Sequence, residues 1–447
     1  MAFDSVYLSS AGGQSKRGKA PQQFTYMTAD SRATILAAGY FSASHSRLFS
    51  IGDSIDFIIV DDASSPAVII ETGTLLVTNI SSAGVVSTSD VTYEAYTGGV
   101  IRIPVFFNQT DLLAGTTQFM PCPVAGTIKR LLSTVQLAVT TGGDLGLTIN
   151  GTAVSGLSIT VADAAAAGTT QSDTPTSPTR VAAGDSLGFT AAAAFATAGA
   201  VHCVLEIIPD VDNGDIFIPF YCNATDLSAG TSQWWPVPVA GTIVSLHTAV
   251  QVAIVTGGAV TVELETAAVT GLSITVEDAA TAGTVQSDTP TSTTTVARGV
   301  DIETVFASDF DGGGAINGGY LLRPTNRADT RNRVFTWFSA NQTDVLAPTS
   351  HWSPNGVRGY VVRGMTAVQL AVGTGGNVIP EIGGVAVDGL TVVVANSAGA
   401  GDIDVDNATP FHDTALVEDA SAIETTFGAA FATSGALNGF WETQAFL

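Results

Sequence analysis

The sequence predicts an all-β protein: a small N-terminal mixed β domain with one short helix, followed by three tandem β-sandwiches of jelly-roll type. Three observations predict this. A stretch of about 115 residues is written three times, as seen at residues 108–112, 223–227 and 341–345. Apolar and polar residues alternate along short segments of each copy, and turn-forming residues separate those segments.

Each copy is long enough to be a domain. Solenoid units span roughly 20–50 residues, so this period is too long for a solenoid. A Val-Gln pair, for instance, recurs at residues 135–136, 250–251 and 368–369. We predict four domains, with boundaries 1–98, 99–212, 213–328 and 329–447. The third repeat diverges most, since the Asp-Thr-Pro step of the others becomes Ala-Thr-Pro, and we expect it to be a specialised tip or contact domain.

In the N-terminal domain, residues 30–39 predict one short helix. Asp30 can cap its free amides, Ile35 and Leu36 would face inward, and Gly39 can end it in the left-handed conformation. Strands are expected after it, with turns between them, at residues 48–60 (with a turn at 52–53), 67–70 and 75–80.

In the repeats, Leu157, Ile159 and Val161 alternate with polar residues, which is typical of a half-buried antiparallel strand. Turn signals divide each copy into about seven or eight strands, which favours a sandwich with jelly-roll topology. The Ala-rich segments 163–168 and 278–283 predict single helical turns, begun by Asp and ended by Gly. The Asn-x-Thr-Asp segments predict turns and caps.

The chain is strongly acidic. Its 40 acids and 16 bases give a net charge of −24, so we expect no nucleic-acid partner. Three bases lie together at Lys16, Arg17 and Lys19. They can dock on an acidic partner, or form a solvated tail, and the sequence leaves both open. The start of the chain has no signal-peptide pattern, and the most apolar stretch, residues 189–208, contains charged and titratable residues. We expect no membrane span and synthesis in the cytosol.

Motifs for chemistry are weak. The cysteines are odd in number and occupy different repeat positions, which indicates free, buried thiols at Cys122, Cys203 and Cys222. The five histidines are scattered, and no phosphate-binding glycine loop is present. We therefore predict no catalytic residue, no metal and no cofactor.

Acidic residues alternate at Asp402, Asp404 and Asp406. A Ca²⁺ loop would need Gly at its sixth and Glu at its twelfth position, where Asn407 and Asp413 stand, so a solvated strand face is the favoured interpretation. A second acidic segment, at residues 210–215, is interpreted as a turn linker between the first two repeats, with stiffening of the joint by Ca²⁺ as the alternative.

Aromatic residues suggest a contact surface. Trp234 and Trp235 align with residues 119–120 of the first repeat, and Trp352 falls in the same region of the third. These rings can stack on sugar rings or contact a subunit. The alternative is that they pack in the core or at a sheet edge.

Two parts of the chain carry a family resemblance. The runs TYMTADSRATILAAGYF, LFSIGDSIDFIIV and LLVTNISSAGVVSTS look like a small domain of tailed-phage structural proteins; this covers residue 25 to about 89. The repeat core, VQLAVTTGGDLGLTINGTAVSGLSITVADAAAAGTTQSDTPTSPTRVAAGDSLGF, is similar to β-sandwich segments of phage capsid decoration and head-fibre proteins.

The resemblance implies a non-enzymatic virion structural protein on the capsid exterior, assembled in the cytoplasm of the host bacterium. Its N-terminal domain would dock on the major capsid protein, with the basic arm at residues 16–19 in the contact, and such proteins are often homotrimers. Two alternatives remain open. One is a tail or fibre adhesin that binds host-surface glycans through the Trp-bearing loops. The other is a depolymerase, which would need two close carboxylates in a groove.

Overall fold

The computed structural model describes residues 4–445 except 11–21, 31, 36–38, 42–47, 52, 61–62, 64–68, 82, 91–98, 193–194, 196–198, 309, 311–312, 327–329, 331, 342–344, 346–349, 409–414, 420, 429–430 and 432–434. The chain divides into two compact units, Met1–Tyr96 and Thr97–Leu447. Among the described residues, no helix is both long and apolar enough to cross a membrane.

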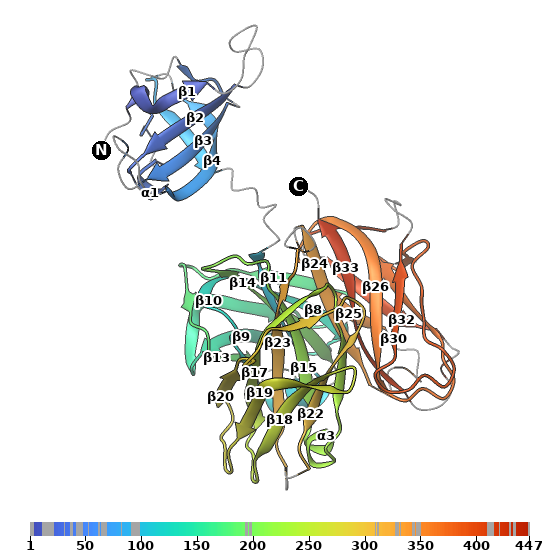
Figure 1. The fold of residues 1–447 in the computed structure, drawn as a ribbon. Helices are drawn as coiled ribbons and strands as arrows, with labels where there is room; N and C mark the ends of the chain where they lie inside the picture. Colours follow the sequence, from blue (N-terminus) through green and yellow to red (C-terminus); the bar gives the residue numbers. More distant parts are fainter. Residues whose placement is uncertain are drawn as a thin grey trace. The chain divides into compact units, whose positions relative to one another are not determined.

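The first unit contains one five-stranded sheet in the order β1-β2-β3-β4-β5 (Figure 1). Only β2 and β3 pair in parallel, and α1 lies between them in the chain. A short 3-10 helix, η1, precedes β1. Buried aromatic and aliphatic side chains fill the core. The elements are η1 Ser5–Tyr7, β1 Leu8–Ser10, β2 Gln23–Thr28, α1 Arg32–Ile35, β3 Ser54–Val60, β4 Ile69–Ile80 and β5 Val86–Asp90.

The predicted helix is present but shorter than expected. Ile35 is fully buried, and Gly39 has φ +84°, as a left-handed stop requires. Asp30 accepts a hydrogen bond from the Tyr40 hydroxyl, while Leu36 lies outside the described residues. The expected turn between residues 70 and 75 is wrong, because β4 runs through it and pairs with β3 from Ile69 to Leu76.

The second unit consists of three jelly rolls. In the first, a sheet in the order β10-β9-β13-β7 packs against one in the order β11-β8-β14-β6, and β12 pairs with β8. This is the strand order of two interleaved Greek keys. The elements are β6 Ile101–Phe107, α2 Gln109–Ala114, β7 Thr117–Pro121, β8 Gly126–Leu137, β9 Gly143–Ile149, β10 Thr152–Val161, β11 Thr170–Asp173, β12 Arg180–Val181, β13 Ser186–Ala191 and β14 Ala200–Pro209.

The second jelly roll repeats this order, as β16-β22-β18-β19 against β15-β23-β17-β20 with β21 beside β17. Its elements are β15 Ile216–Cys222, α3 Ala224–Ser228, β16 Gln233–Pro236, β17 Gly241–Val252, β18 Gly258–Leu264, β19 Ala267–Val276, β20 Val285–Asp288, β21 Thr294–Val296, β22 Asp301–Phe306 and β23 Ala315–Pro324.

The third jelly roll has the orders β25-β32-β27-β28 and β24-β33-β26-β30, with β29 beside β27 and β31 beside β26. The fold class predicted from the sequence is therefore confirmed in all three copies. The elements are β24 Arg333–Ala340, β25 His351–Pro354, β26 Gly359–Leu370, β27 Asn377–Ile382, β28 Val385–Ala386, β29 Val392–Val393, β30 Ile403–Asn407, β31 Leu416–Val417, β32 Ala422–Phe427 and β33 Ala436–Ala445.

Local details follow the sequence in part. Asn108 caps α2 in a capping box, and Asn223 caps α3, as the Asn-x-Thr-Asp segments predicted. The helical turns expected at residues 163–168 and 278–283 are wrong. Asp163 instead accepts a hydrogen bond from the backbone amide of Gly142, 2.8 Å away, and Ala164 has φ +55°. The Asp ties this loop to a hairpin rather than starting a helix.

Candidate functional site: a closed ring of three sandwiches and its axis

A glutamine at the same position of each repeat joins neighbouring sandwiches. The side chain of Gln251 binds the backbone of β7 in the first sandwich, accepting from Phe119 N at 2.6 Å and donating to Thr117 O at 2.8 Å. In the same way, Gln369 accepts from Trp234 N at 2.8 Å, so the third sandwich holds the second.

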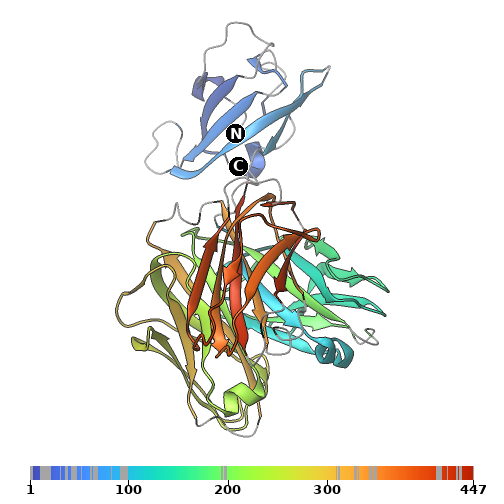
Figure 2. The ribbon, with the colours of Figure 1, turned by 90° about the vertical axis from the view of Figure 1, so that its right-hand side faces the viewer.

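The first sandwich holds the third. Gln136, the equivalent residue in β8, donates to Trp352 O in β25 at 3.2 Å. The contacts therefore run from the second sandwich to the first, from the third to the second, and from the first to the third. A cycle of like contacts closes a ring, and the three sandwiches lie side by side in both ribbon views (Figures 1 and 2).

An aromatic ring beside each glutamine contact packs on a glycine of the neighbouring sandwich. A Cβ atom placed on Gly168 would lie 2.8 Å from the ring of Trp352. Gly401 lies against Trp234 in the same way, and Gly283 lies against Phe119, so all three interfaces share this contact. Each of these glycines has a positive φ: Gly168 +82°, Gly283 +83° and Gly401 +88°. Each lies in the loop that follows Asp163, Asp278 or Asn396, whose side chains accept a hydrogen bond from a hairpin amide.

The tryptophans singled out from the sequence thus lie at or near contacts between sandwiches. Trp234 and Trp352 are half-buried in these contacts. Trp235 is only 1% exposed and lies in the core of the second sandwich, where its ring meets Trp337 of the third at 5.7 Å.

The first strands of the sandwiches, β6, β15 and β24, lie around the common axis of the ring. Two cavities are lined by residues of all three strands. The first axial cavity, of about 30 Å³, lies where the strands begin; the second axial cavity, of about 500 Å³, lies where they end. The strands therefore run in the same direction along the axis.

The second axial cavity combines aromatic and amide side chains. Phe106 and Tyr221, at equivalent positions, meet edge to face at 5.1 Å. The helix-capping Asn108 and Asn223 line it, together with Asn341 at the third equivalent position. Asp111, the carboxyl group of the capping box, also lies in its wall, and burial raises the pKa of this group.

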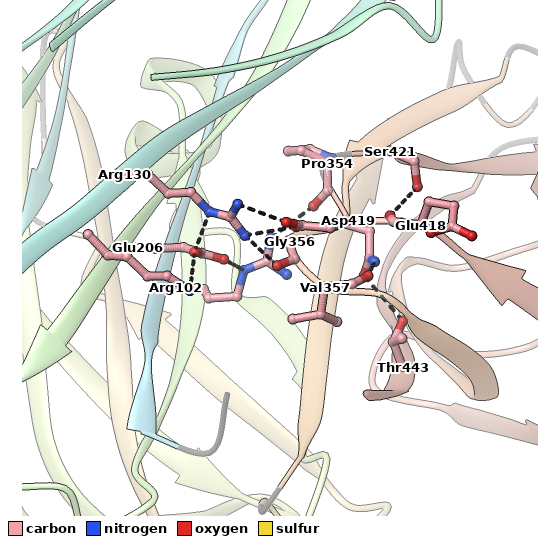
Figure 3. A network of polar contacts seen from close by, with 12 residues as sticks. Arg102, Arg130, Glu206, Pro354, Gly356, Val357, Glu418, Asp419, Ser421 and Thr443 are labelled. Atoms are coloured by element: carbon pink, nitrogen blue, oxygen red, sulfur yellow. Dashed lines mark hydrogen bonds and ion pairs between the residues drawn. The ribbon is translucent and has the colours of Figure 1, made fainter. Parts of the chain in front are cut away.

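An ion network occupies the interface between the first and third sandwiches (Figure 3). Glu206 in β14 lies 3.4 Å from Arg102, 3.5 Å from Lys129 and 2.8 Å from Arg130, and its side chain is only 3% exposed. Arg130 crosses the interface to Asp419, 3.0 Å away.

Both arginines of the network also bind backbone of the third sandwich. Arg102 donates to Pro354 O at 3.0 Å, and Arg130 donates to Gly356 O. Burial lowers the pKa of Arg102, and the nearby Arg130 lowers it further. For Arg130, the carboxylates of Glu206 and Asp419 outweigh burial and raise the pKa. This network joins the first and last repeats of the chain and so closes the ring.

The same positions differ in the other sandwiches. In the third, the corresponding residues are Phe335, Arg363 and Glu442. Glu442 pairs with Arg363 and also with Arg333, and Arg363 donates to Pro238 O of the second sandwich at 2.8 Å. In the second sandwich, the residues that stand where Arg102, Arg130 and Glu206 stand in the first are Phe217, Ser245 and Leu321. The Arg–Glu pair of the first and third sandwiches is thus replaced by uncharged residues in the second.

The buried His202 lies at a contact between sandwiches. His202 stands where Asn317 and Asn438 stand in the other repeats, and those two amides donate across their interfaces to Phe119 O at 3.0 Å and Trp234 O at 2.9 Å. His202 Nδ1 lies 3.1 Å from the Ser353 hydroxyl of the third sandwich. Burial lowers the pKa of His202 to about 3.

The remaining residues predicted from the sequence are distributed as follows. Lys16, Arg17 and Lys19 lie outside the described residues. The cysteines are free and buried, as expected. Asp404 and Asp406 lie in strand β30, with Asp402 just before it. Within the described part of the chain, no group of three His, Cys, Asp or Glu residues could hold a metal ion.

The sequence alone did not reveal the axial cavities or the ion network. The recurring Val-Gln pair was the one visible signal of the ring, because it repeats a polar residue at the end of an otherwise apolar strand. Nothing local distinguishes Arg102 or Glu206 from ordinary surface charges, since their partners come from another repeat.

No protein-family model matches this chain, and no curated protein matches it. Among solved structures, the major capsid protein P2 of bacteriophage PM2 is 10% identical over 50% of this chain and 99% of that chain, with a TM-score of 0.16. A structure described as the triple jelly roll fold and turret assembly in an archaeal virus is 10% identical over 82% and 88%, with a TM-score of 0.17. A Paenibacillus xanthan lyase is 10% identical over 86% and 36%, with a TM-score of 0.17. Likenesses this distant carry no argument about function.

Proposed function

We propose that this chain is a non-enzymatic structural protein of a tailed-phage virion, a capsid decoration or head-fibre protein. The observation that carries the proposal is the closed ring: three jelly rolls in one chain, joined to a small domain that has its own core. Such an arrangement suits a protein whose ring is displayed while the small domain attaches it to a larger assembly. The resemblance of both parts to phage structural proteins supports it.

In this proposal the N-terminal domain binds the major capsid protein, and Lys16, Arg17 and Lys19 contribute electrostatic attraction to an acidic capsid surface. The acidic ring projects from the particle and keeps its exterior soluble. The role is attachment and shielding, and the polar networks described above serve to hold the ring together rather than to act on a substrate.

The homotrimer expected from the family resemblance stays a prediction. Three sandwiches already form a closed ring within one chain, so a three-fold contact surface needs only one copy. Light scattering of the purified protein separates the two cases: a mass of 45.5 kDa indicates one chain, and three times that mass indicates a trimer.

Co-sedimentation with particles that lack this protein tests the proposal. We expect the full chain to pellet with heads and the ring alone, beginning at Gly99, to remain in the supernatant. A full-length variant with Lys16, Arg17 and Lys19 changed to Gln should bind more weakly and lose salt dependence. Equal binding by the ring alone would move the anchor out of residues 1–98. Absence of head binding by the full chain would refute the proposal.

The adhesin remains the second candidate, and the second axial cavity is the observation that favours it. Half-buried rings beside amide side chains suit a sugar, because the rings stack on its C–H face and the amides bind hydroxyl groups. Trp234 and Trp352 face neighbouring sandwiches instead. Host-cell binding that is lost in Val252→Trp, at the cavity, but kept in Val255→Trp, outside its lining, would support the adhesin.

A further inference from the structure

Positive charge exceeds negative charge around the first axial cavity, although the chain as a whole carries −24. Four acids of the described residues pair with bases there: Glu206, Asp215, Asp419 and Glu442. They are shared among six bases: Arg102, Lys129, Arg130, Arg323, Arg333 and Arg363. Of these residues, three bases (Arg102, Lys129 and Arg333) and two acids (Glu206 and Asp215) line the cavity itself, so the described lining carries one surplus positive charge in a partly dry site, where an unbalanced charge is costly.

Arg102 shows most clearly what is missing. Its side chain is 8% exposed, one amino group donates to Pro354 O, and Nε lies 3.4 Å from Glu206. The other amino group, Nη1, is buried and has no hydrogen-bond acceptor in the described part of the chain. Glu206 cannot supply one fully, because Lys129 and Arg130 share it. A buried charged donor without an acceptor is destabilising.

The first axial cavity lies beside this donor. Arg102, Lys129 and Arg333 line it, with Glu206 and Asp215, whose carboxylates are already engaged in ion pairs. Its volume of about 30 Å³ is roughly twice what a single water needs. The space is therefore on the scale of a small ion with its closest ligands.

We propose that the first axial cavity binds one small oxyanion of the phosphate class, held by Arg102, Lys129 and Arg333. Oxyanions supply several acceptors at once, which suits a guanidinium fork and an ammonium group. Arg102 and Lys129 come from the first sandwich and Arg333 from the third, and Ile216 and Phe217 of β15 in the second complete the wall. The bound ion would therefore tie all three sandwiches together at the axis.

Thermal unfolding of the full chain tests this, because all five tryptophans lie in the ring and report its unfolding by fluorescence. Inorganic phosphate is titrated against potassium chloride at matched ionic strength, and equilibrium dialysis measures bound phosphate. We expect a saturable rise in melting temperature and one phosphate bound per chain.

Variants separate binding from general salt effects, since phosphate also stabilises proteins by exclusion from their surface. Lys129→Met should weaken phosphate binding about tenfold or more, the size expected for one lost charged hydrogen bond. Lys129 is 29% exposed, so this variant should fold. Arg180→Met removes a base of the same sandwich that is 61% exposed and outside the cavity lining, and it should keep the full response.

Two results would overturn the proposal. One is an equal phosphate response in the native protein and in Lys129→Met, which is the pattern of surface exclusion. The other is dialysis that finds no bound phosphate in the folded native chain, which leaves the cavity to water. Neither result bears on head binding, so the proposed function stands or falls separately.

Discussion

Glu206→Leu would remove the carboxylate that three bases share at the interface of the first and third sandwiches. Its side chain is 3% exposed and lies between 2.8 and 3.5 Å from Arg102, Lys129 and Arg130. Breaking a buried ion pair from one side leaves uncompensated charge and typically costs about 3–5 kcal/mol. We expect a loss of that size in the free energy of unfolding.

The second sandwich provides the matched rescue. It carries Phe217, Ser245 and Leu321 at the positions of Arg102, Arg130 and Glu206. The triple variant Arg102→Phe, Arg130→Ser, Glu206→Leu copies this apolar solution, and we expect it to recover more than half of the loss. Full recovery is not expected, because Pro354 O and Gly356 O lose their donors.

Urea unfolding followed by tryptophan fluorescence measures both variants, since every tryptophan belongs to the ring. A cost for the single variant below about 1 kcal/mol, the value of an exposed ion pair, would refute the argument that this network is desolvated. A triple variant less stable than the single one would refute the apolar alternative.

Three further outcomes are expected. Burial lowers the pKa of His202 to about 3 in the folded protein, against about 6.5 in the unfolded chain, so the unfolded state binds the proton more tightly. The free energy of unfolding should therefore decrease as the pH drops below about 6.5. His202→Asn, which copies Asn317, should reduce this decrease, as measured by melting temperature against pH. Gly168→Ala should cost more in urea unfolding than Gly184→Ala: both have positive φ, but a Cβ meets Trp352 at 2.8 Å only in the former. Equal costs would contradict the ring contact. A thiol reagent should label the native chain only after denaturation, because burial raises the pKa and blocks access at Cys122, Cys203 and Cys222.

The jelly rolls were predictable because their signals are local. Alternation at Leu157, Ile159 and Val161 needs only five consecutive residues, and the structure buries all three side chains. The caps at Asn108 and Asn223 are likewise set by the three residues that follow them.

The ring was not predictable from such signals. Gln136 meets a residue 216 positions away, and Arg130 meets one 289 positions away. The helical turn expected at residues 163–168 failed for a related reason. Asp is a residue type that often caps helices, but the carboxylate of Asp163 accepts a hydrogen bond from a hairpin amide 21 residues earlier in the chain. The conformations and contacts of these residues depend on partners far away in the sequence, which local sequence patterns do not identify.

Closure of the ring within a single polypeptide changes how it can evolve. In an assembly of three identical chains, one codon change appears three times around the axis. Here it appears once, so Arg102 could arise opposite Phe217 and Phe335 without placing three arginines together. Genetic fusion therefore permits inequality at the centre of a symmetric body, and the charge of the first axial cavity is an instance of it.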